Sequence, residues 1–334
     1  MFLSTFKTLV LATYISQASA SCGYGTILQP RAENGTVKVN NFGYIGSTGP
    51  ANWIALDPAA NALCSNGKRQ SPINMVPGSV SVVPGAELAM TIPDMPEGTE
   101  FENLGTTVEV VAKGGNMSFG GVQYSLQQFH FHLPSEHLDN GTSMAMEVHM
   151  VWQGAAGQVA VTGFFVDLND GANGGGAPVA AAGKKRSSLQ ERRLATRQEQ
   201  EQQPAEGSNN TKLPELEGAF FHVNAPQSGA MKSSTLLETV LGSVDAIAKP
   251  GTVTKTQPLV MSELVQALSS GSFQTYEGSL TTPPCTEGVR WLVSNQKMSI
   301  QTSTFLKARS VIGFNSRFPQ NVPGQNNILS INSS

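Results

Sequence analysis

The chain has 334 residues, with 21 Lys and Arg against 24 Asp and Glu, and a net charge of −3. This balance excludes electrostatic capture of nucleic acid or of an acidic membrane surface as the main function. Hydrophobic residues make up 39% of the chain, enough for a sizeable core, and its 34 glycines and 19 prolines favour a turn-rich β protein over a helical bundle.

Residues 1–20 form a predicted secretory signal peptide. Lys7 precedes an apolar run over residues 8–15, and the sequence from Ala18 to Ala20 fits a cleavage site. The run is too short to span a membrane, and no other stretch approaches the roughly 18 apolar residues that a spanning helix needs. We therefore expect a chain that starts near Ser21, has no membrane anchor, and is secreted to an extracellular, periplasmic or cell-wall space.

Two further features fit an oxidising secretory environment. N-x-S/T sequences predict N-glycosylation at Asn34, Asn116, Asn140 and Asn209. The three cysteines, Cys22, Cys64 and Cys285, allow three different single disulfides. Because chain termini are usually mobile, the position of Cys22 favours a Cys64–Cys285 pair. Cys22 would then be free, blocked, or paired between two molecules in a dimer.

The predicted strands lie mainly in the first part of the mature chain, residues 21–168. Apolar and polar residues alternate there in four runs, at 107–111, 127–132, 146–152 and 159–166. The second part, residues 218–334, contains a predicted helix at 259–268 and a predicted strand at 289–294. We expect the two parts to belong to one domain.

Residues 169–217 differ in composition from both parts and are predicted to be an inserted segment. Residues 171–182 are rich in Gly and Ala, and residues 184–217 hold seven basic and six acidic residues. Such a segment buries little apolar surface, so we expect it to be solvated and flexible, with a transient helix around 188–203. The basic runs that end at Arg186 and Arg193 are either sites of proteolytic processing or parts of an uncut surface loop.

Four of the five histidines lie between His130 and His149. Side chains alternate along a strand, so His130 and His132 share one face while the phenylalanines beside them face the core. The turn sequence at 139–142 predicts that the strand carrying His149 runs antiparallel to theirs. Three neutral imidazoles can then converge on one point, which suits a catalytic zinc ion with water at its fourth position. His137 and His222 fall outside this pattern.

Metal-binding histidines need a partner for the ring nitrogen that does not bind the metal. Gln128 and Glu147 each lie two residues before a candidate ligand and share its face. We therefore expect Gln128 to orient His130, and Glu147 to orient His149.

With these histidines, the sequence resembles the α-class carbonic anhydrases from about Asn40 to Pro319, apart from the inserted segment. The resemblance also rests on Tyr44, Trp53, the run from Gln70 to Asn74 (QSPIN), the run from Ser135 to His137 (SEH), and the run from Gly278 to Trp291 (GSLTTPPCTEGVRW). It implies a mainly β (α+β) single domain with a large, twisted, mostly antiparallel central sheet and short peripheral helices.

The resemblance also implies a reaction, the reversible hydration of carbon dioxide to bicarbonate and a proton. Zinc-bound hydroxide would be the nucleophile, with the metal held by His130, His132 and His149. Thr281, donating its own proton to Glu136, would orient that hydroxide. Carbon dioxide and bicarbonate are the only partners it implies.

Further residues match positions around the site in the family. Gln128, Glu147 and the backbone carbonyl of Asn315 would support the histidines, and Cys64 and Cys285 would form a disulfide. The substrate-side positions are Val151, Val161, Leu280, Thr282 and Trp291. Where the fastest relatives carry a proton-shuttling histidine, this chain has Thr106, whose hydroxyl is not a useful acid or base at neutral pH.

Two alternative functions remain open on the sequence alone. The spacing of His130, His132 and Glu136 also fits the first metal motif of cupins, which would bind manganese or iron, but the second cupin motif is absent after His149. A related module that only binds ligands is the other alternative, although all three zinc histidines, Thr281 and Glu136 are present.

Overall fold

The computed structural model describes residues 22–27, 37–169 and 233–330. The predicted signal peptide, the helix expected near 188–203, the basic runs at Arg186 and Arg193, and the sites Asn34 and Asn209 lie outside these residues. Internal contacts divide the chain into one unit of residues 1–169 and 231–334 and another of residues 170–230. Among the described residues, no helix has the length and apolar character needed to cross a membrane.

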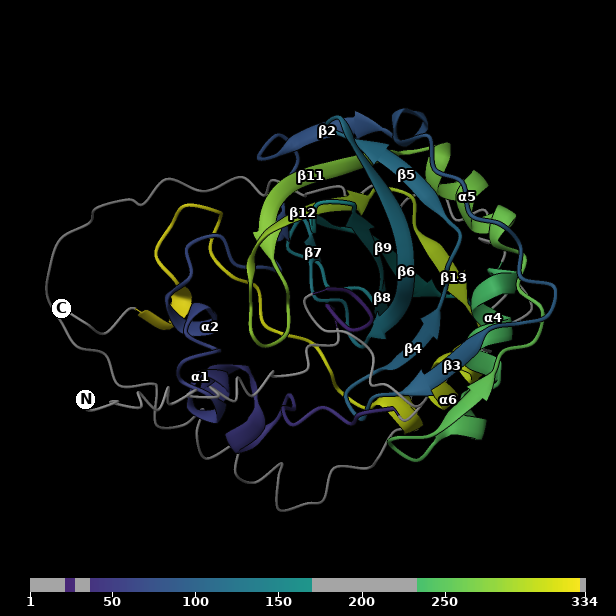
Figure 1. The fold of residues 1–334 in the computed structure, drawn as a ribbon, viewed down its shortest axis with the longest axis horizontal. Helices are drawn as coiled ribbons and strands as arrows, with labels where there is room; N and C mark the ends of the chain where they lie inside the picture. Colours follow the sequence, from purple (N-terminus) through teal and green to yellow (C-terminus); the bar gives the residue numbers. More distant parts are fainter. Residues whose placement is uncertain (1–21, 28–36, 170–232, 331–334) are drawn as a thin grey trace, which may run out of the picture. The chain divides into compact units, whose positions relative to one another are not determined.

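An eleven-stranded sheet is the centre of the first unit (Figure 1). Its strands, in spatial order, are β10 (Val253–Lys255), β3 (Glu100–Asn103), β4 (Val108–Val111), β6 (Val122–His132), β8 (Met146–Gly154), β9 (Val159–Leu168), β12 (Glu287–Ser294), β11 (Ser272–Ser279) and β2 (Ser81–Pro84). Two further strands join this path, with β5 (Asn116–Phe119) pairing with β6 and β13 (Met298–Ile300) pairing with β9. Within this sheet, as described, only the pairs β9–β12 and β9–β13 are parallel, so the prediction of a large, mostly antiparallel sheet is confirmed.

The predicted pairing of the two histidine strands is also confirmed. β6 and β8 are antiparallel neighbours in the middle of the sheet, and their register places His130 opposite His149. An irregularity between Leu126 and Gln128 shifts the register before the histidines are reached. A separate parallel pair, β1 (Asn74–Met75) with β7 (Leu138–Asp139), holds the QSPIN segment against the turn between β6 and β8.

Short helices surround the sheet, as expected. They are α1 (Trp53–Leu56), α2 (Leu63–Asn66), α4 (Thr235–Gly242), α5 (Met261–Ser269) and α6 (Thr302–Ile312), with 3₁₀ helices η1 (Gly46–Thr48), η2 (Pro50–Asn52), η3 (Gly85–Leu88), η4 (Val244–Ile247) and η5 (Ile328–Ser330). Helix α5 corresponds to the helix predicted at 259–268 but begins two residues later. The reason is that the backbone of Leu259 exchanges two hydrogen bonds with Met95 instead of entering the helix.

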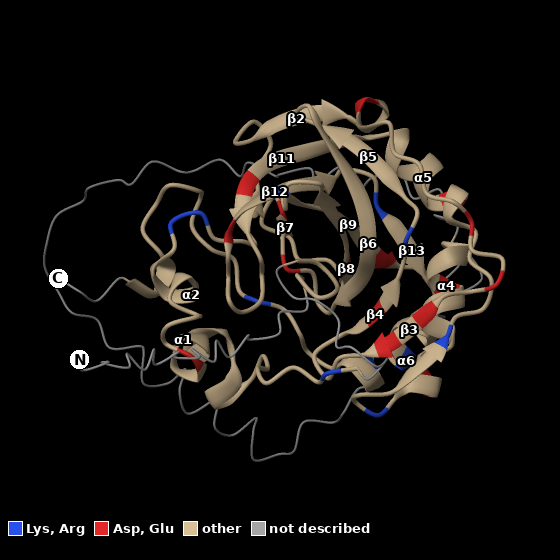
Figure 2. Cartoon of the chain, viewed as in Figure 1, with Lys and Arg blue, Asp and Glu red and all other residues tan. Residues whose placement is uncertain are grey.

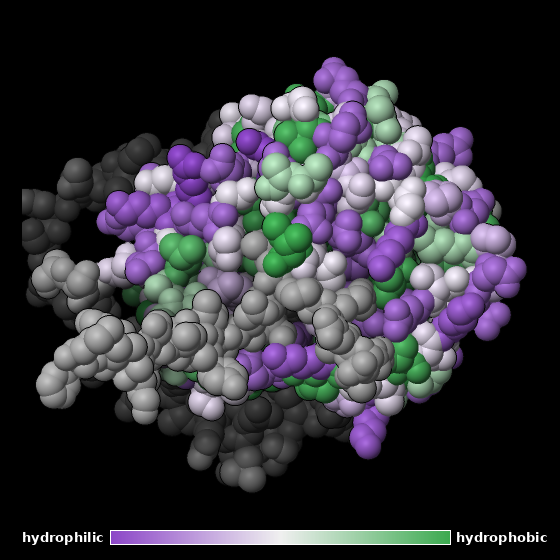
Figure 3. All heavy atoms as spheres, in the orientation of Figure 1, coloured by the Kyte–Doolittle hydropathy of each residue, from purple (hydrophilic) through white to green (hydrophobic). Residues whose placement is uncertain are grey.

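The two faces of the central strands contribute to different clusters of buried side chains. Phe129 and Phe131 of β6 pack edge to face in the larger cluster, which also includes buried residues of α4 and α5. A smaller cluster on the histidine side contains Val151, Val161 and Trp291. The strands β3 and β4 carry acidic residues (red in Figure 2), among them the buried Glu102 and Glu109. On the face shown in Figure 3, apolar residues are scattered among polar ones.

Candidate metal centre and active site

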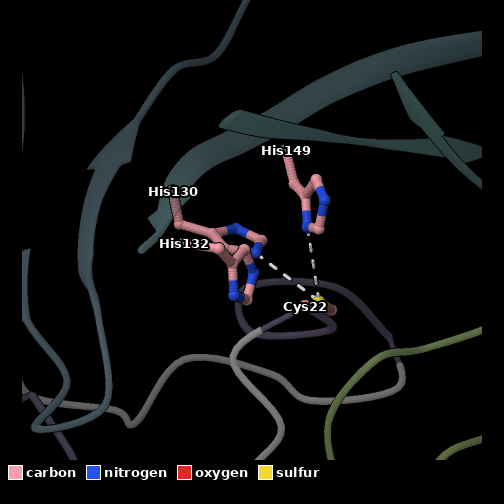
Figure 4. Close-up of side chains that lie close together, drawn as sticks. All are labelled: Cys22, His130, His132 and His149. Carbon is pink, nitrogen blue, oxygen red and sulfur yellow. Dashed lines mark hydrogen bonds between the residues drawn. The ribbon is translucent and has the colours of Figure 1, made fainter. Parts of the chain in front are cut away.

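His130 and His132 on β6 and His149 on β8 converge from the two central strands (Figure 4). All three side chains are fully buried, and one ligand atom from each, together with the sulfur of Cys22, fits within 4.8 Å of the others. Burial is the main cause of a lowered pKa in each, and it brings the pKa of His132 to about 3. The three imidazoles are therefore neutral and have lone pairs available for a metal ion.

The ring nitrogens that face away from this point each have an acceptor. His130 Nδ1 lies 2.8 Å from Gln128 Oε1, and His132 Nδ1 lies 2.8 Å from the carbonyl oxygen of Asn315. His149 Nε2 lies 2.9 Å from Glu147 Oε1. These contacts set the tautomers and leave His130 Nε2, His132 Nε2 and His149 Nδ1 as the inward atoms.

His132 Nε2 tests whether the site fits a metal ion. It is a buried nitrogen without a hydrogen-bond partner in the structure. Such an atom is costly in a protein interior unless something outside the polypeptide binds it. The donor set, three neutral imidazoles with oriented outer nitrogens, is the one that zinc takes in catalytic sites. The residues present therefore fit a zinc ion.

Glu147 connects the metal ligands to a wider network. Its carboxylate accepts the backbone N–H groups of Glu136 and His137, at 2.9 and 2.8 Å, and lies 2.7 Å from His137 Nδ1. Burial alone would raise its pKa, but His137 and His149 lower the pKa of Glu147 well below its ordinary value. His137 Nε2 in turn lies 2.7 Å from the hydroxyl of Tyr276. The sequence did not predict this bridging position of His137, and the only available sign was its place in the SEH run.

Thr281 and Glu136 are both buried, and Glu136 Oε1 lies 3.4 Å from His132 Nδ1. Burial raises the pKa of Glu136 well above its ordinary value, and the hydrogen bond from the Arg317 backbone opposes this shift. The Arg317 N–H donates to Glu136 Oε1 at 2.8 Å. The Arg317 guanidinium is buried and donates to the carbonyl of Ser71 at 2.7 Å. This arginine holds the QSPIN segment to the site, a role that spacing along the sequence does not reveal.

The apolar residues predicted beside the metal lie together. One cluster contains four fully buried residues: Val151 on β8, Val161 on β9, Trp291 on β12, and Leu280 in the loop between β11 and β12. Thr282 is also fully buried. The ring centroid of Trp291 is 4.8 Å from that of His149. A disulfide joins Cys64 in α2 to Cys285 and ties down the loop between β11 and β12 that carries Thr281.

The expectation that Cys22 lies in a mobile terminus is wrong. Its side chain is fully buried, with Sγ 3.5 Å from His130 Nε2 and 4.0 Å from His149 Nδ1 (Figure 4). The same sulfur lies 3.0 Å from Thr281 Oγ1. Burial raises the pKa of this thiol to about 12. Within the described residues the only disulfide is intramolecular, so a dimer linked through Cys22 has no support.

Thr106 is linked to the histidines through Asn315. It is buried, and its hydroxyl accepts a hydrogen bond from the side chain of Asn40. Its backbone carbonyl accepts from the Asn315 side chain at 2.9 Å, while the Asn315 carbonyl faces His132. No titratable side chain therefore stands at this position.

Comparison with known proteins decides the family. The sequence model of eukaryotic-type carbonic anhydrases matches residues 48–175 and 185–328. The chain belongs to the carbonic anhydrase family. The chain is therefore a carbonic anhydrase enzyme, and not a cupin or a module that only binds ligands. The family as a whole hydrates carbon dioxide and depends on zinc.

Individual carbonic anhydrases match most of the chain. A carbonic anhydrase of Nostoc is 28% identical over 85% of this chain and 81% of its own length. The structure of a fungal α-carbonic anhydrase from Aspergillus oryzae has 31% identity and a TM-score of 0.66, covering 87% of this chain and 98% of that one. The α-carbonic anhydrase of Thermovibrio ammonificans, solved with the inhibitor sulfanilamide, has 26% identity and a TM-score of 0.59, covering 84% and 96%.

Proposed function

We propose that the enzyme catalyses the reversible hydration of carbon dioxide to bicarbonate and a proton, with Zn²⁺ held by His130, His132 and His149. The observation that carries this proposal is the orientation of the three rings. Each outer nitrogen has an acceptor at 2.8 to 2.9 Å, and the inward nitrogens meet in one buried group. When bound, the metal supplies a Lewis acid that brings the pKa of a water molecule down to about 7.

Three groups on the protein keep the ligands ready for the metal. Gln128, the Asn315 carbonyl and Glu147 hold the proton of each imidazole on its outer nitrogen, so that the inward nitrogen presents a lone pair. Glu147 also accepts from His137 and two backbone N–H groups, which fixes its position in the buried network. We assign these groups a positioning role.

We assign the orientation of the nucleophile to Thr281 and Glu136. A threonine hydroxyl has one proton, and when it donates that proton to the Glu136 carboxylate it can only accept from the attacking oxygen. That oxygen then turns a lone pair towards carbon dioxide. The positive charge of a divalent cation beside the site would favour the ionised form of Glu136, opposing the effect of burial on its pKa.

The substrate pocket in this proposal is the apolar wall of Val151, Val161, Leu280 and Trp291, with Thr282 at its edge. Carbon dioxide is small and has no net dipole, so an apolar surface beside the nucleophile binds it without competing hydrogen bonds. Bicarbonate is charged and is poorly matched to the same wall, which favours its release.

At position 106 the chain has threonine in place of a histidine that could transfer the proton out of the site. The Thr106 hydroxyl accepts from Asn40 and does not titrate near neutral pH. We propose that external buffer carries this proton, which limits the rate at low buffer concentration.

The cellular setting remains a proposal as well. We propose secretion after removal of residues 1–20, a single catalytic domain formed by residues 21–168 and 218–334, and an insertion at 169–217. The disulfide is compatible with an oxidising compartment. Asn116 and Asn140 are exposed and accessible to N-glycosylation, and mass spectrometry of the secreted protein with and without a glycosidase tests both sites.

The test of the proposed function is stopped-flow hydration of carbon dioxide by protein of measured zinc content. Both the parent and a Cys22→Ala variant are assayed, since the Cys22 sulfur lies against the ligand atoms. We expect one zinc per chain and activity that a sulfonamide abolishes, while a His132→Ala variant loses both zinc and activity. A Cys22→Ala protein that holds one zinc per chain and hydrates no carbon dioxide would refute the function.

A further inference from the structure

We propose that Cys22 is the fourth protein ligand of the zinc ion and holds the enzyme in a latent state. The inference rests on the proposed function, because it assumes that the three histidines bind the metal. Its basis is the position of the sulfur, which faces two of the three inward nitrogens and contacts Thr281, the residue assigned to orient the nucleophile.

The distance from the sulfur to His130 Nε2 matches an edge of a coordination tetrahedron, and the distance to His149 Nδ1 is 0.5 Å longer. With Zn–S about 2.3 Å and Zn–N about 2.0–2.1 Å, two ligand atoms of a tetrahedral zinc site lie about 3.5 Å apart along a sulfur–nitrogen edge. The structure gives 3.5 Å from Sγ to His130 Nε2 and 4.0 Å to His149 Nδ1. His132 contributes the remaining inward nitrogen, which has no hydrogen-bond partner. One sulfur and three nitrogens form a closed zinc site, in which no position remains for water.

The segment that carries Cys22, residues 22–27, is packed into the site by burial and hydrogen bonds. Residues 22–27 lie inside the curve of the sheet (purple in Figure 1), and Cys22, Tyr24 and Thr26 are all buried. The backbone N–H of Thr26 donates to the carbonyl of Gly23 at 3.2 Å, which closes a turn with Gly25 at a positive φ of 77°. The backbone N–H of Cys22 donates to Thr282 Oγ1 at 3.4 Å.

Cys22 also occupies the side of the pocket assigned to the substrate. It belongs to the same buried cluster as Val151, Val161, Leu280 and Trp291. A sulfur at this point excludes both the water that the metal would activate and the carbon dioxide that would react with it. On binding the metal the thiol releases its proton to solvent and the sulfur coordinates as a thiolate, with no other bond formed or broken.

Catalysis then requires residues 22–27 to leave the site. The ligand set changes from three nitrogens and one sulfur to three nitrogens and water. The active and latent forms therefore differ in whether sulfur coordinates the metal, which can be measured by spectroscopy without an activity assay. For a sulfonamide that binds only the open form, the apparent Kd is the Kd of the open form divided by the fraction of molecules that are open. A site closed in 99% of molecules therefore binds the sulfonamide about 100-fold more weakly than a fully open site.

The experiment compares three mature chains loaded with cobalt(II): the parent, Cys22→Ala, and Ile27→Ala as a control at an exposed position of the same segment. We expect a near-ultraviolet sulfur-to-cobalt charge-transfer band in the parent and in Ile27→Ala, and none in Cys22→Ala. On the zinc forms we expect sulfonamide affinity and the rate of carbon dioxide hydration to rise by at least about tenfold in Cys22→Ala, since only the open fraction reacts.

The outcomes separate this inference from the proposed function. A parent protein without the charge-transfer band, and with the same hydration rate as Cys22→Ala, overturns the ligation by Cys22 while the proposed function stands. If the band is present in the parent but zinc-loaded Cys22→Ala hydrates no carbon dioxide, the ligation stands and the proposed function is overturned. If none of the three chains binds cobalt, both are overturned.

Discussion

His130 lies directly opposite His149 in the antiparallel ladder between β6 and β8. Since side chains change face at every residue, a slip of one residue in this register would turn one of the two rings into the core occupied by Phe129 and Phe131. The metal site therefore depends on the register that follows the irregularity between Leu126 and Gln128.

Replacing Glu147 with glutamine tests the support of the ligands. An amide keeps the shape but presents only one acceptor oxygen, while the carboxylate accepts from His137, His149 and two backbone N–H groups. We expect zinc affinity to fall about 10- to 100-fold, the range typical of such partners, measured by competition with a chelator. The control is Glu277→Gln, since Glu277 pairs with Arg69 at the surface. Equal affinities in both variants would contradict the assigned role.

The Thr281 hydroxyl is tested in the Cys22→Ala background, where the sulfur cannot mask the effect. We expect Thr281→Ala to lower kcat by about 100-fold while zinc content stays at one per chain, because removing one preorganised hydrogen bond in an active site has an effect of this size. Thr281→Ser keeps the hydroxyl and is expected to recover most of the rate. If serine performs no better than alanine, the methyl group and not the hydroxyl is what matters.

Buffer dependence tests the absence of an internal proton shuttle. With Thr106 at this position, kcat of the Cys22→Ala protein is expected to rise with the concentration of an imidazole-type buffer. Introducing a histidine by Thr106→His is expected to raise kcat at low buffer and to flatten the dependence. A rate already independent of buffer with threonine in place would show that another group moves the proton.

Acid is expected to destabilise the metal-free protein through its buried histidines. The pKa of His132 is lowered from 6.5 to about 3 by burial, so below pH 6.5 the unfolded chain binds a proton that the folded chain does not. Its contribution to the free energy of unfolding is therefore complete above pH 6.5 and is lost as the pH falls towards 3, at about 1.4 kcal/mol per pH unit.

Urea unfolding of the metal-free protein at several pH values between 7.5 and 4.5 measures this loss. A His132→Gln variant lacks the titrating ring, so its stability should fall less steeply below pH 6.5, by about 1.4 kcal/mol per pH unit. Parallel slopes for the two proteins would mean that His132 remains accessible to protons in the folded state.

Much of the site follows from local rules, and the rest depends on contacts between distant segments. Strand parity and one turn were enough to bring His130, His132 and His149 together and to place Gln128 and Glu147 beside them. The contacts of Arg317 with Glu136 and Ser71 join segments far apart in the sequence, so no periodicity marks them. Position in the sequence was misleading for Cys22, because the general mobility of termini does not apply to a side chain that packs among the buried residues of the site.

The parallel pairing of β9 with β12 and β13 has a consequence for how the chain could be divided. β9 precedes residues 170–232 and its two partners follow them, so one continuous sheet is assembled from the parts of the chain on both sides of that stretch. The disulfide between Cys64 and Cys285 links the same two sides. Two separately encoded polypeptides, divided within that stretch and secreted together, should therefore reassemble by fragment complementation into one covalently joined enzyme.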